Sequence, residues 1–240
     1  GDYDGMVVDD VAVINTDDDT AGFTLTPTTL ISIENDTDQT FTVVLDSEPT
    51  ADLTIGIASS DTTEGTVDKA TLTFTSADWD SPQTVTVTPQ DDSDFDGDIT
   101  YSIVTTADSV TADTNYNGLD PADVSVSNED DEAVQVDLGV KTDGSEAGPT
   151  NITFEAVLDK TNLTGSDITV QFDTADNTAT AGSDYTAITS GTITIANSTD
   201  RGTIDVAVLD DGDTEGTETV DGTISNISNT TITISTTTAT

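Results

Sequence analysis

Residues 71–75 read Thr-Leu-Thr-Phe-Thr, and residues 83–88 read Gln-Thr-Val-Thr-Val-Thr. In both stretches large apolar side chains alternate with polar ones, which predicts β-strands with one face on a core and the other in water. Threonine suits the wet face, because it is β-branched and polar. The same alternation recurs along the chain, in residues 41–45, 168–172, 193–195 and 204–208. No segment carries a sustained apolar stripe with helical spacing, so the pattern favours an all-β protein.

An internal repeat divides the chain. Eight residues between Tyr3 and Asp18 recur between Tyr116 and Asp131 at a constant offset of 113. About seven short strands with turn residues between them fit each complete repeat, which predicts two tandem antiparallel Greek-key, immunoglobulin-like β-sandwiches. The expected division is residues 1–19 as the final strand of a preceding repeat or a donated strand, 20–131 as one sandwich, and 132–240 as a second, diverged one.

The composition excludes several classes of function. The 240 residues include 48 acidic and 4 basic side chains, with no Cys and no His, and the formal net charge is −44. So few cations exclude a surface that tracks nucleic-acid phosphates, and no apolar run is long enough to insert in a membrane. Without imidazole or thiol, the usual nucleophilic machinery is missing. We therefore expect no enzyme activity.

The acidic residues are expected to gather at one end of each sandwich. In the first unit, strands are predicted at about 22–33, 40–46, 52–58, 66–75, 83–88, 99–106 and 122–128. Alternate loops of such a sandwich emerge at the same end, so the first, third and fifth loops and the end of the last strand share a pole. The acids in those segments are Glu34, Asp36, Asp38, Asp61, Glu64, Asp91, Asp92, Asp94, Asp96, Asp98, Glu129, Asp130 and Asp131. The second unit repeats this arrangement with Asp143, Glu146, Asp176, Asp184, Asp210, Asp211, Asp213, Glu215 and Glu218.

Such a concentration of carboxylates repels itself unless water, salt or bound cations compensate. Ca²⁺ takes six to eight oxygen ligands in flexible geometry, whereas Mg²⁺ keeps its water and needs a stricter octahedron, so Ca²⁺ is the expected ion. The run from Asp92 to Gly97 begins like an EF-hand loop. Its twelfth position is Ile103 instead of the required Glu, and no helix is predicted on either side, so an EF-hand is excluded.

The stretch Thr174-Ala-Asp-Asn-Thr-Ala-Thr-Ala-Gly-Ser-Asp-Tyr-Thr186 resembles the signature of Calx-beta domains, and the later acidic run from Asp210 to Glu218 resembles the family's second acidic motif. This resemblance covers about residues 132–235. Residues 20–131 resemble a related Calx-beta-like repeat of large bacterial surface proteins. Calx-beta domains are β-sandwiches, many of which bind several Ca²⁺ ions at one pole.

The resemblance implies a set of Ca²⁺ ligands in each unit. In the second unit these are Glu146, Asp176, Asp184, Asp210 and Asp211. In the first unit the corresponding places fall to Glu34, Asp61, Asp91 and Asp92, with Asp130 and Asp131 supplied after the last strand. The first unit lacks the Gly-Ser-Asp-Tyr motif, and residues 132–240 do not contain an acidic strand end like that of the first unit.

Three hypotheses of function remain open. The first is a Ca²⁺-binding structural or adhesive segment of a long extracellular surface protein or filament, in which the ion rigidifies the junctions with neighbouring repeats or with head-to-tail copies. In one variant, residues 1–19 of one copy complete the second sandwich of another by strand addition. The second is a glycan-binding accessory module of a secreted enzyme, with a surface glycan or protein as its partner. The third is salt adaptation without a specific site.

Overall fold

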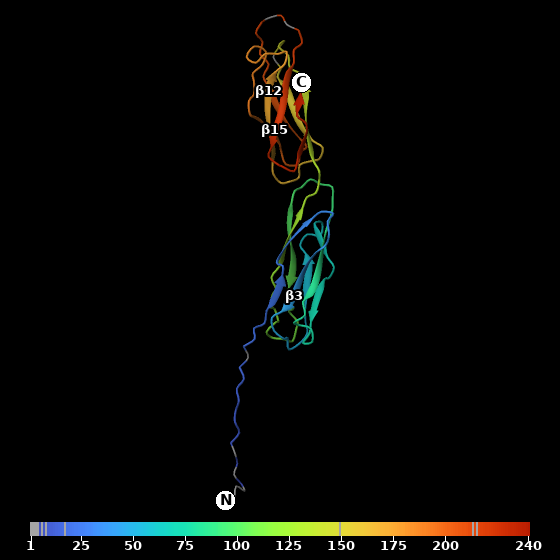
Figure 1. Cartoon of the computed structure of the whole chain (residues 1–240), viewed down its shortest axis with the longest axis vertical. Coiled ribbons are helices and arrows are strands. Elements are labelled where there is room, and N and C mark those ends of the chain that lie inside the picture. The colour runs from blue at the N-terminus through green and yellow to red at the C-terminus, as the bar shows by residue number, and fades with distance from the viewer. Residues whose placement is uncertain are drawn as a thin grey trace.

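The computed structural model describes all residues except 1–4, 6, 8, 17, 149, 213 and 215. Two β-sandwiches lie end to end, and the described residues before Thr20 form an extended segment at the far end of the first sandwich (Figure 1). The secondary structure of the described residues is entirely β. None of them forms a helix long and apolar enough to cross a membrane.

The first sandwich pairs a four-stranded sheet with a five-stranded one. The four-stranded sheet has the order β1 (Phe23–Thr26), β3 (Gln39–Leu45), β7 (Gln83–Pro89) and β5 (Gly65–Val67). The five-stranded sheet has the order β2 (Thr29–Ile33), β9 (Val124–Glu129), β8 (Ile99–Thr106), β4 (Leu53–Ser59) and β6 (Thr71–Phe74).

The second sandwich is built from two four-stranded sheets. One has the order β14 (Arg201–Val206), β11 (Ile152–Leu158), β10 (Gln135–Thr142) and β16 (Thr233–Thr236). The other has the order β13 (Gly191–Ile195), β12 (Ile168–Asp176), β15 (Val220–Ile227) and β17 (Thr238–Ala239).

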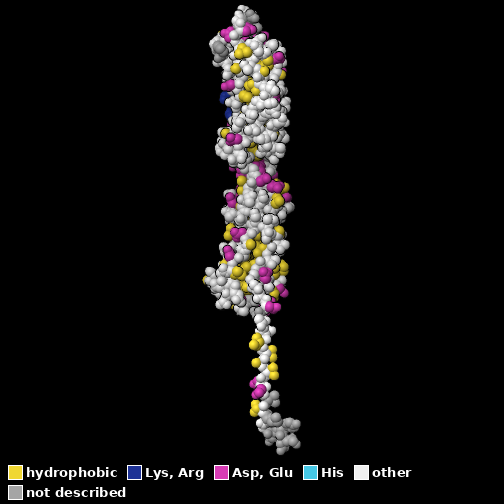
Figure 2. All heavy atoms as spheres, turned by 90° about the vertical axis from the view of Figure 1, so that its left-hand side faces the viewer, with side chains coloured by type: hydrophobic (Ala, Val, Ile, Leu, Met, Phe, Trp, Pro, Cys, Tyr) yellow, Lys and Arg dark blue, Asp and Glu magenta, His cyan; other side chains and the backbone are white. Residues whose placement is uncertain are grey.

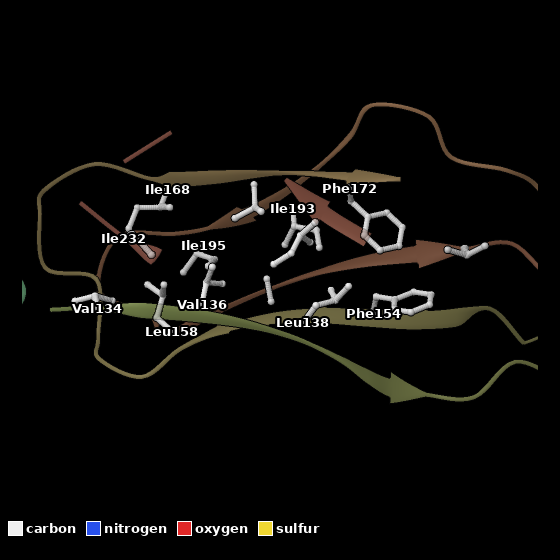
Figure 3. Packing of buried hydrophobic residues seen from close by; sticks show 14 of the residues in the cluster. Val134, Val136, Leu138, Phe154, Leu158, Ile168, Phe172, Ile193, Ile195 and Ile232 are labelled. Atoms are coloured by element: carbon white, nitrogen blue, oxygen red, sulfur yellow. The ribbon is translucent and has the colours of Figure 1, made fainter. Parts of the chain in front are cut away.

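Each sandwich encloses its own hydrophobic core, as alternating strands require. Val43, Ile55 and Val85 lie at the centre of the first core and are fully buried. In the second core, side chains from β10, β11, β12 and β13 interleave between the sheets (Figure 3), and the Phe154 and Phe172 rings are 5.0 Å apart. The predicted all-β architecture of two tandem β-sandwiches is confirmed.

The structure departs from the predicted strands in three respects. The expected strand 66–75 is two strands, β5 and β6, which lie in different sheets. The expected strand 22–33 is two strands, because Pro27, which follows a cis peptide bond, has no N–H to continue the ladder beside β3. The chain then crosses to the other sheet, where β2 pairs with β9 in parallel. A parallel pair of the same kind joins β10 and β16 in the second unit. The strand pairs of the described residues are therefore antiparallel except for β2 with β9 and β10 with β16.

The described residues before Thr20 belong to no strand. Val11, Val13 and Ile14 are 86%, 84% and 89% exposed. The prediction that residues 1–19 are a strand of a preceding repeat falls partly on residues outside the described set (1–4, 6, 8 and 17), and it stays a prediction.

Candidate metal centres

The parallel pairing of β2 and β9 brings two acidic chain segments together at the end of the first sandwich that faces the second. Ile33 is the register partner of Glu129, and the Glu34 amide donates to the Glu129 carbonyl at 3.0 Å. Both strands run towards the same end, so the residues that follow them emerge side by side. This is why Glu34 lies beside Asp131, although 97 positions separate them in the sequence.

Three of the predicted ligands meet at this end. One carboxylate oxygen from each of Glu34, Asp91 and Asp131 lies within 4.8 Å of the others. Glu34 is buried, and the two Asp side chains are exposed. One buried and two accessible carboxylates on three different segments form a partial shell of the kind that oxygen-seeking cations use.

A further buried carboxyl group, that of Glu64, shares a hydrogen-bond donor with Glu34. Glu34 is 4% exposed and Glu64 is 6% exposed. The Asn128 side-chain amide donates to both of them, at 3.4 Å to Glu34 Oε1 and 3.3 Å to Glu64 Oε2. Glu34 Oε2 also accepts the Asp92 amide at 3.4 Å. Neutral amides at these distances compensate two buried acids weakly, because buried charges need pairing or strong hydrogen bonds.

Burial raises the pKa values of several of these acids. Desolvation, aided by repulsion from Asp92, Glu132 and Glu64, raises the pKa of Glu34 to about 7. Desolvation also raises the pKa of Asp96 to about 6, with repulsion from Glu64, Asp92 and Asp130 as lesser causes. The pKa of Glu132 is raised as well, again mainly by desolvation. In the absence of a cation, holding these groups ionised is therefore costly.

Two buried oxygens in the cluster lack any hydrogen-bond partner: Asp96 Oδ1 and Glu132 Oε2. The other oxygen of Glu132 lies 3.7 Å from Lys160 Nζ. Unpaired buried carboxylate oxygens are costly, and a cation bound to such an oxygen removes that cost. The donor set of carboxylate oxygens on several loops, with no nitrogen or sulfur ligand, fits Ca²⁺. Glu34, Asp91 and Asp131 would hold such an ion, with Asp96 and Glu132 within the same cluster.

The other predicted ligands of the first unit accept hydrogen bonds from nearby residues. Asp130 receives the Gly97 amide on Oδ2 at 2.6 Å and the Glu132 amide on Oδ1 at 3.0 Å. Asp92 receives the Asp94 amide at 2.7 Å. Asp61 accepts hydrogen bonds from Thr63, which lower its pKa. These three acids shape the loops around the triad and lie outside the group of mutually close oxygens.

This acidic cluster lies at the junction of the two sandwiches. Phe95, from the loop between β7 and β8, is 3% exposed and packs with the core residues of the second unit. Its carbonyl accepts the Leu163 amide at 2.9 Å. Lys160 donates to the Ser93 carbonyl at 3.1 Å and faces Glu132. Acidic side chains gather at the narrow waist between the units (Figure 2). The cluster therefore shares its loops with the contact between the sandwiches.

The second unit brings its predicted ligands to its free end, around a groove of about 690 Å³. Glu146, Asp184 and Glu218 line this groove. Desolvation, then a hydrogen bond and repulsion from Asp184, raises the pKa of Glu218, and repulsion from Glu146 and Asp211 contributes. These acids are thus close enough to interact. Asp213 and Glu215, predicted to lie in the same loop, are outside the described residues.

Asp176 and Asp210 lie at the edge of this arrangement. Asp176 accepts hydrogen bonds from the Tyr185 hydroxyl at 2.7 Å and the Ala181 amide at 2.9 Å, and the first of these is the main cause of its lowered pKa. Asp210 is exposed. Among the described residues, the geometric grouping of three mutually close ligand atoms occurs in the first unit alone.

Sequence reasoning did not name Glu64, Asp96, Glu132 or Asn128 as site residues. Glu64 and Asp96 lie in the predicted acidic loops, but nothing in an acidic turn shows which carboxyl is buried. The Glu132 side chain is 7% exposed and pairs with Lys160 of the second sandwich, a contact that the pattern of one repeat does not show. The signal for Asn128 was available, since it is an inward-facing polar residue at the end of an apolar alternation with Val124 and Val126.

Comparison with known proteins identifies one domain. The Calx-beta domain family matches residues 150–240. No curated protein matches the chain. Among solved structures, CBD12 from CALX1.2 is 16% identical over 85% of this chain and 80% of its own, with a TM-score of 0.36. The apo-form Calx CBD1 domain is 18% identical over 45% of this chain and 95% of its own, with a TM-score of 0.35. The family match includes the signature at residues 174–186, so residues 150–240 are similar to Calx-beta domains.

Proposed function

We propose that this chain is a Ca²⁺-binding structural segment of an extracellular surface protein or filament, in which the ion stiffens the junction between consecutive sandwiches. The observation that carries the proposal is the pair of buried, unpartnered oxygens of Asp96 and Glu132 beside the Glu34, Asp91 and Asp131 triad. Asp91 and Asp96 belong to the loop between β7 and β8, and Asp131 and Glu132 to the segment between β9 and β10; both segments lie at the junction of the two units. A cation held there would neutralise the cluster and tie the loops together.

The charge balance at the junction supports the same proposal. Several carboxyl groups repel one another here: Glu64 and Glu132 repel Glu34, and Glu64 also repels Asp96. Lys160 is the basic side chain within ion-pair distance of Glu132. The single positive charge of Lys160 cannot offset this many carboxylates in a partly dry site. Extracellular modules bind Ca²⁺ with modest affinity, in the range of ambient extracellular concentrations. An array of such modules would be rigid outside a cell and loosened by a chelator.

Thermal unfolding with Ca²⁺ and with a chelator tests the binding. An ion that binds the folded state alone raises the midpoint of unfolding. Replacing Glu34 by Gln keeps the side-chain size and removes the charge, so E34Q should weaken Ca²⁺ binding by about tenfold or more, equivalent to ~1.4 kcal/mol. Calorimetric titration of the wild type and the variant supplies the stoichiometry.

The matched control is Glu48→Gln, the same substitution at an exposed acid in the loop that follows β3. E48Q should titrate like the wild type. An unfolding midpoint that is identical in Ca²⁺ and in chelator would refute the proposal. An E48Q effect as large as that of E34Q would show that overall charge matters instead of the cluster.

A further inference from the structure

The chain segments that enter and leave the first sandwich meet in one pair of strands. β1 leads into β2 through residues 27–28, and β9 leads into the segment before β10. β2 pairs with β9 in parallel over five consecutive positions, from Thr29↔Ser125 to Ile33↔Glu129, without a register shift. This pair therefore links the segment that enters the sandwich directly to the segment that leaves it.

Backbone hydrogen bonds close the pair at both ends. At the start of β2, the Ser125 amide donates to the Thr28 carbonyl at 3.0 Å. At its end, the Glu34 amide donates to the Glu129 carbonyl at 3.0 Å. The ladder is thus complete over the whole length of β2.

Register partners in this pair make unequal contributions to the ladder. The bonds of a parallel pair are evenly spaced, so between its two ends the amide and carbonyl of Ser127 point at β2. The amide and carbonyl of Ile31, the partner of Ser127, point to the other side, where β2 is the outermost strand of the sheet. A substitution that removes an amide should therefore weaken the pair at Ser127 and spare it at Ile31.

Side chains cross-link the same two strands. The Ser32 hydroxyl donates to Asn128 Oδ1 at 3.0 Å, and both side chains are buried. The Asn128 amide reaches Glu34 Oε1 at 3.4 Å. Buried hydrogen bonds are shielded from competing water, so these contacts add to the backbone ladder.

Tension along the chain would shear this pair. The segment before β1 leaves the first sandwich at its far end, whereas the segment after β9 leaves it at the junction with the second sandwich (Figure 1). A pull on these segments draws β2 and β9 in opposite directions along their common axis. In shear the bonds of a ladder resist together, whereas strands that are peeled from one end lose their bonds one at a time.

We propose that the β2–β9 pair is a mechanical clamp, which allows the first sandwich to resist tension carried along the chain. β1, which pairs with β3 over four positions, is drawn on first, and the β2–β9 pair still holds once β1 has detached. The need to resist tension rests on the proposed role as a segment of a surface protein or filament. The clamp itself is a property of the strand order and does not depend on that role.

A bound cation would strengthen the same clamp. Glu34 directly follows β2, and Asp131 lies two residues after the end of β9. Their carboxylate oxygens lie within 4.8 Å of each other in the triad with Asp91. An ion held there would join the two sheared strands at the point where the ladder ends. This contribution rests on the proposed Ca²⁺ binding, whereas the hydrogen-bonded clamp does not.

Single-molecule force spectroscopy in two pulling directions tests the clamp. Because the chain has no cysteine, handles can be attached at chosen exposed residues. Thr20→Cys/Ala133→Cys pulls β2 along β9, whereas Thr37→Cys/Ala133→Cys peels the pair from its junction end. In chelator, the first pair of handles should require a force at least about twofold higher, because all bonds of the ladder resist together. Both measurements unfold the same sandwich, so a difference reports on the direction of the force.

Two proline variants locate the resistance within the sandwich. Ser127→Pro removes an amide that bonds β2, whereas Ile31→Pro, at the register partner, removes an amide on the free edge. Under the shearing handles, S127P should lower the unfolding force by about half, towards the value for peeling, and I31P should retain most of it. Ser32→Ala removes the side-chain bond to Asn128 and leaves the backbone ladder complete, so it should give a smaller loss in the same direction.

Equal unfolding forces in the two directions would overturn the proposal, as would I31P and S127P proteins that are equally weakened. Addition of Ca²⁺ should raise the shearing force further in the wild type and much less in E34Q. A directional difference that ignores Ca²⁺ would support the clamp and refute the metal proposal. Forces that respond to Ca²⁺ equally in both directions, with no difference between the directions, would do the reverse.

Discussion

The Glu34 carboxyl shows how a single residue links burial to ion binding. Desolvation raises its pKa to about 7, and repulsion from Asp92, Glu132 and Glu64 adds to the effect. Without a bound cation, the folded protein holds a proton on Glu34 that the unfolded chain, with a pKa near 4.5, has already released. The stability of the metal-free protein should therefore fall as the pH rises from about 4.5 to about 7.

This linkage predicts a pH-dependent response to Ca²⁺. At about pH 5 the ion must displace the proton on Glu34, whereas at about pH 8 the carboxylate is ionised and uncompensated. The increase in the unfolding midpoint on adding Ca²⁺ should be larger at the higher pH, by several degrees for a sandwich of this size. Differential scanning calorimetry at both pH values measures it.

The E34Q variant is the control for this pH effect. Its Ca²⁺-dependent increase should vary less with pH than that of the wild type, while Asp96, with a pKa near 6, leaves a residual slope. A wild-type response that is the same at both pH values would contradict the assignment of the titrating group to the cluster.

Asp108, at the opposite end of the first sandwich, has a lowered pKa, in contrast to Glu34. Its carboxylate accepts the amides of Thr54, Val110 and Thr111 at 2.7, 2.8 and 2.9 Å. The bonds from Thr54 and Val110 are the chief causes of its lowered pKa. The stability that they contribute is present at neutral pH and is lost as the pH falls through the lowered pKa.

Replacing Asp108 by Ala should destabilise the protein by about 2–4 kcal/mol, because three backbone donors lose their acceptor in a buried place. Urea unfolding at neutral pH measures this loss, and the difference from the wild type should shrink in acid. Asp80→Ala is the matched control, since Asp80 is exposed in a loop at the same end and its loss should cost little. A D108A protein as stable as D80A would contradict the capping role.

The loop between β7 and β8 acts as a connector between the units. It places Asp91, Asp92 and Asp96 at the cluster and Phe95 among the core residues of the second sandwich. Loss of a buried Phe side chain costs about 3–5 kcal/mol. Phe95→Ala should therefore lower the unfolding midpoint of the second sandwich while leaving the packing of the first, which does not include Phe95, largely intact.

Small-angle scattering supplies a second measurement for this variant. The F95A chain should bend more at the junction, with a shorter mean length in solution than the wild type. Phe95→Leu retains most of the apolar volume and should cost less than about 1.5 kcal/mol. If F95A unfolds and scatters like the wild type, the contact is not a structural connection between the units.

Strand patterns predicted the fold well and the site incompletely. Alternation in residues 71–75 and 83–88 located β6 and β7, because the period of two is a local property of the sequence. The single strand predicted over residues 22–33 was wrong, although Pro27 in its middle is a local signal for the split into β1 and β2. The parallel pairing of β2 with β9, which brings Glu34 to Asp131, is a long-range feature without a local signal.

The same distinction explains the site residues that were missed. Phe95 lies in an acidic run that predicts a solvated turn, and only the neighbouring sandwich makes it a core residue. Burial of Glu132 likewise depends on Lys160 from the next unit. Contacts between units cannot be derived from the pattern of one repeat.

At the scale of the whole molecule, a net charge of −44 on 240 residues includes two populations of acids. Most are exposed side chains, whose mutual repulsion salt screens: the screening length is about 10 Å at 0.1 M and ~3 Å at 1 M. The few buried at the junction, such as Glu34 and Glu64, are screened much less. Monovalent salt and Ca²⁺ should therefore act on different residues.

High salt separates these populations in one experiment. In chelator, raising NaCl to about 1 M should stabilise the protein by relieving surface repulsion. Adding millimolar Ca²⁺ at that salt concentration should still raise the unfolding midpoint by several degrees, because Na⁺ does not supply the multidentate coordination that buried carboxylates offer Ca²⁺. The same addition should have a much smaller effect on E34Q. If salt alone removed the response to Ca²⁺ in the wild type, the acidity would serve adaptation to brine, and the buried oxygens of Asp96 and Glu132 would need another explanation.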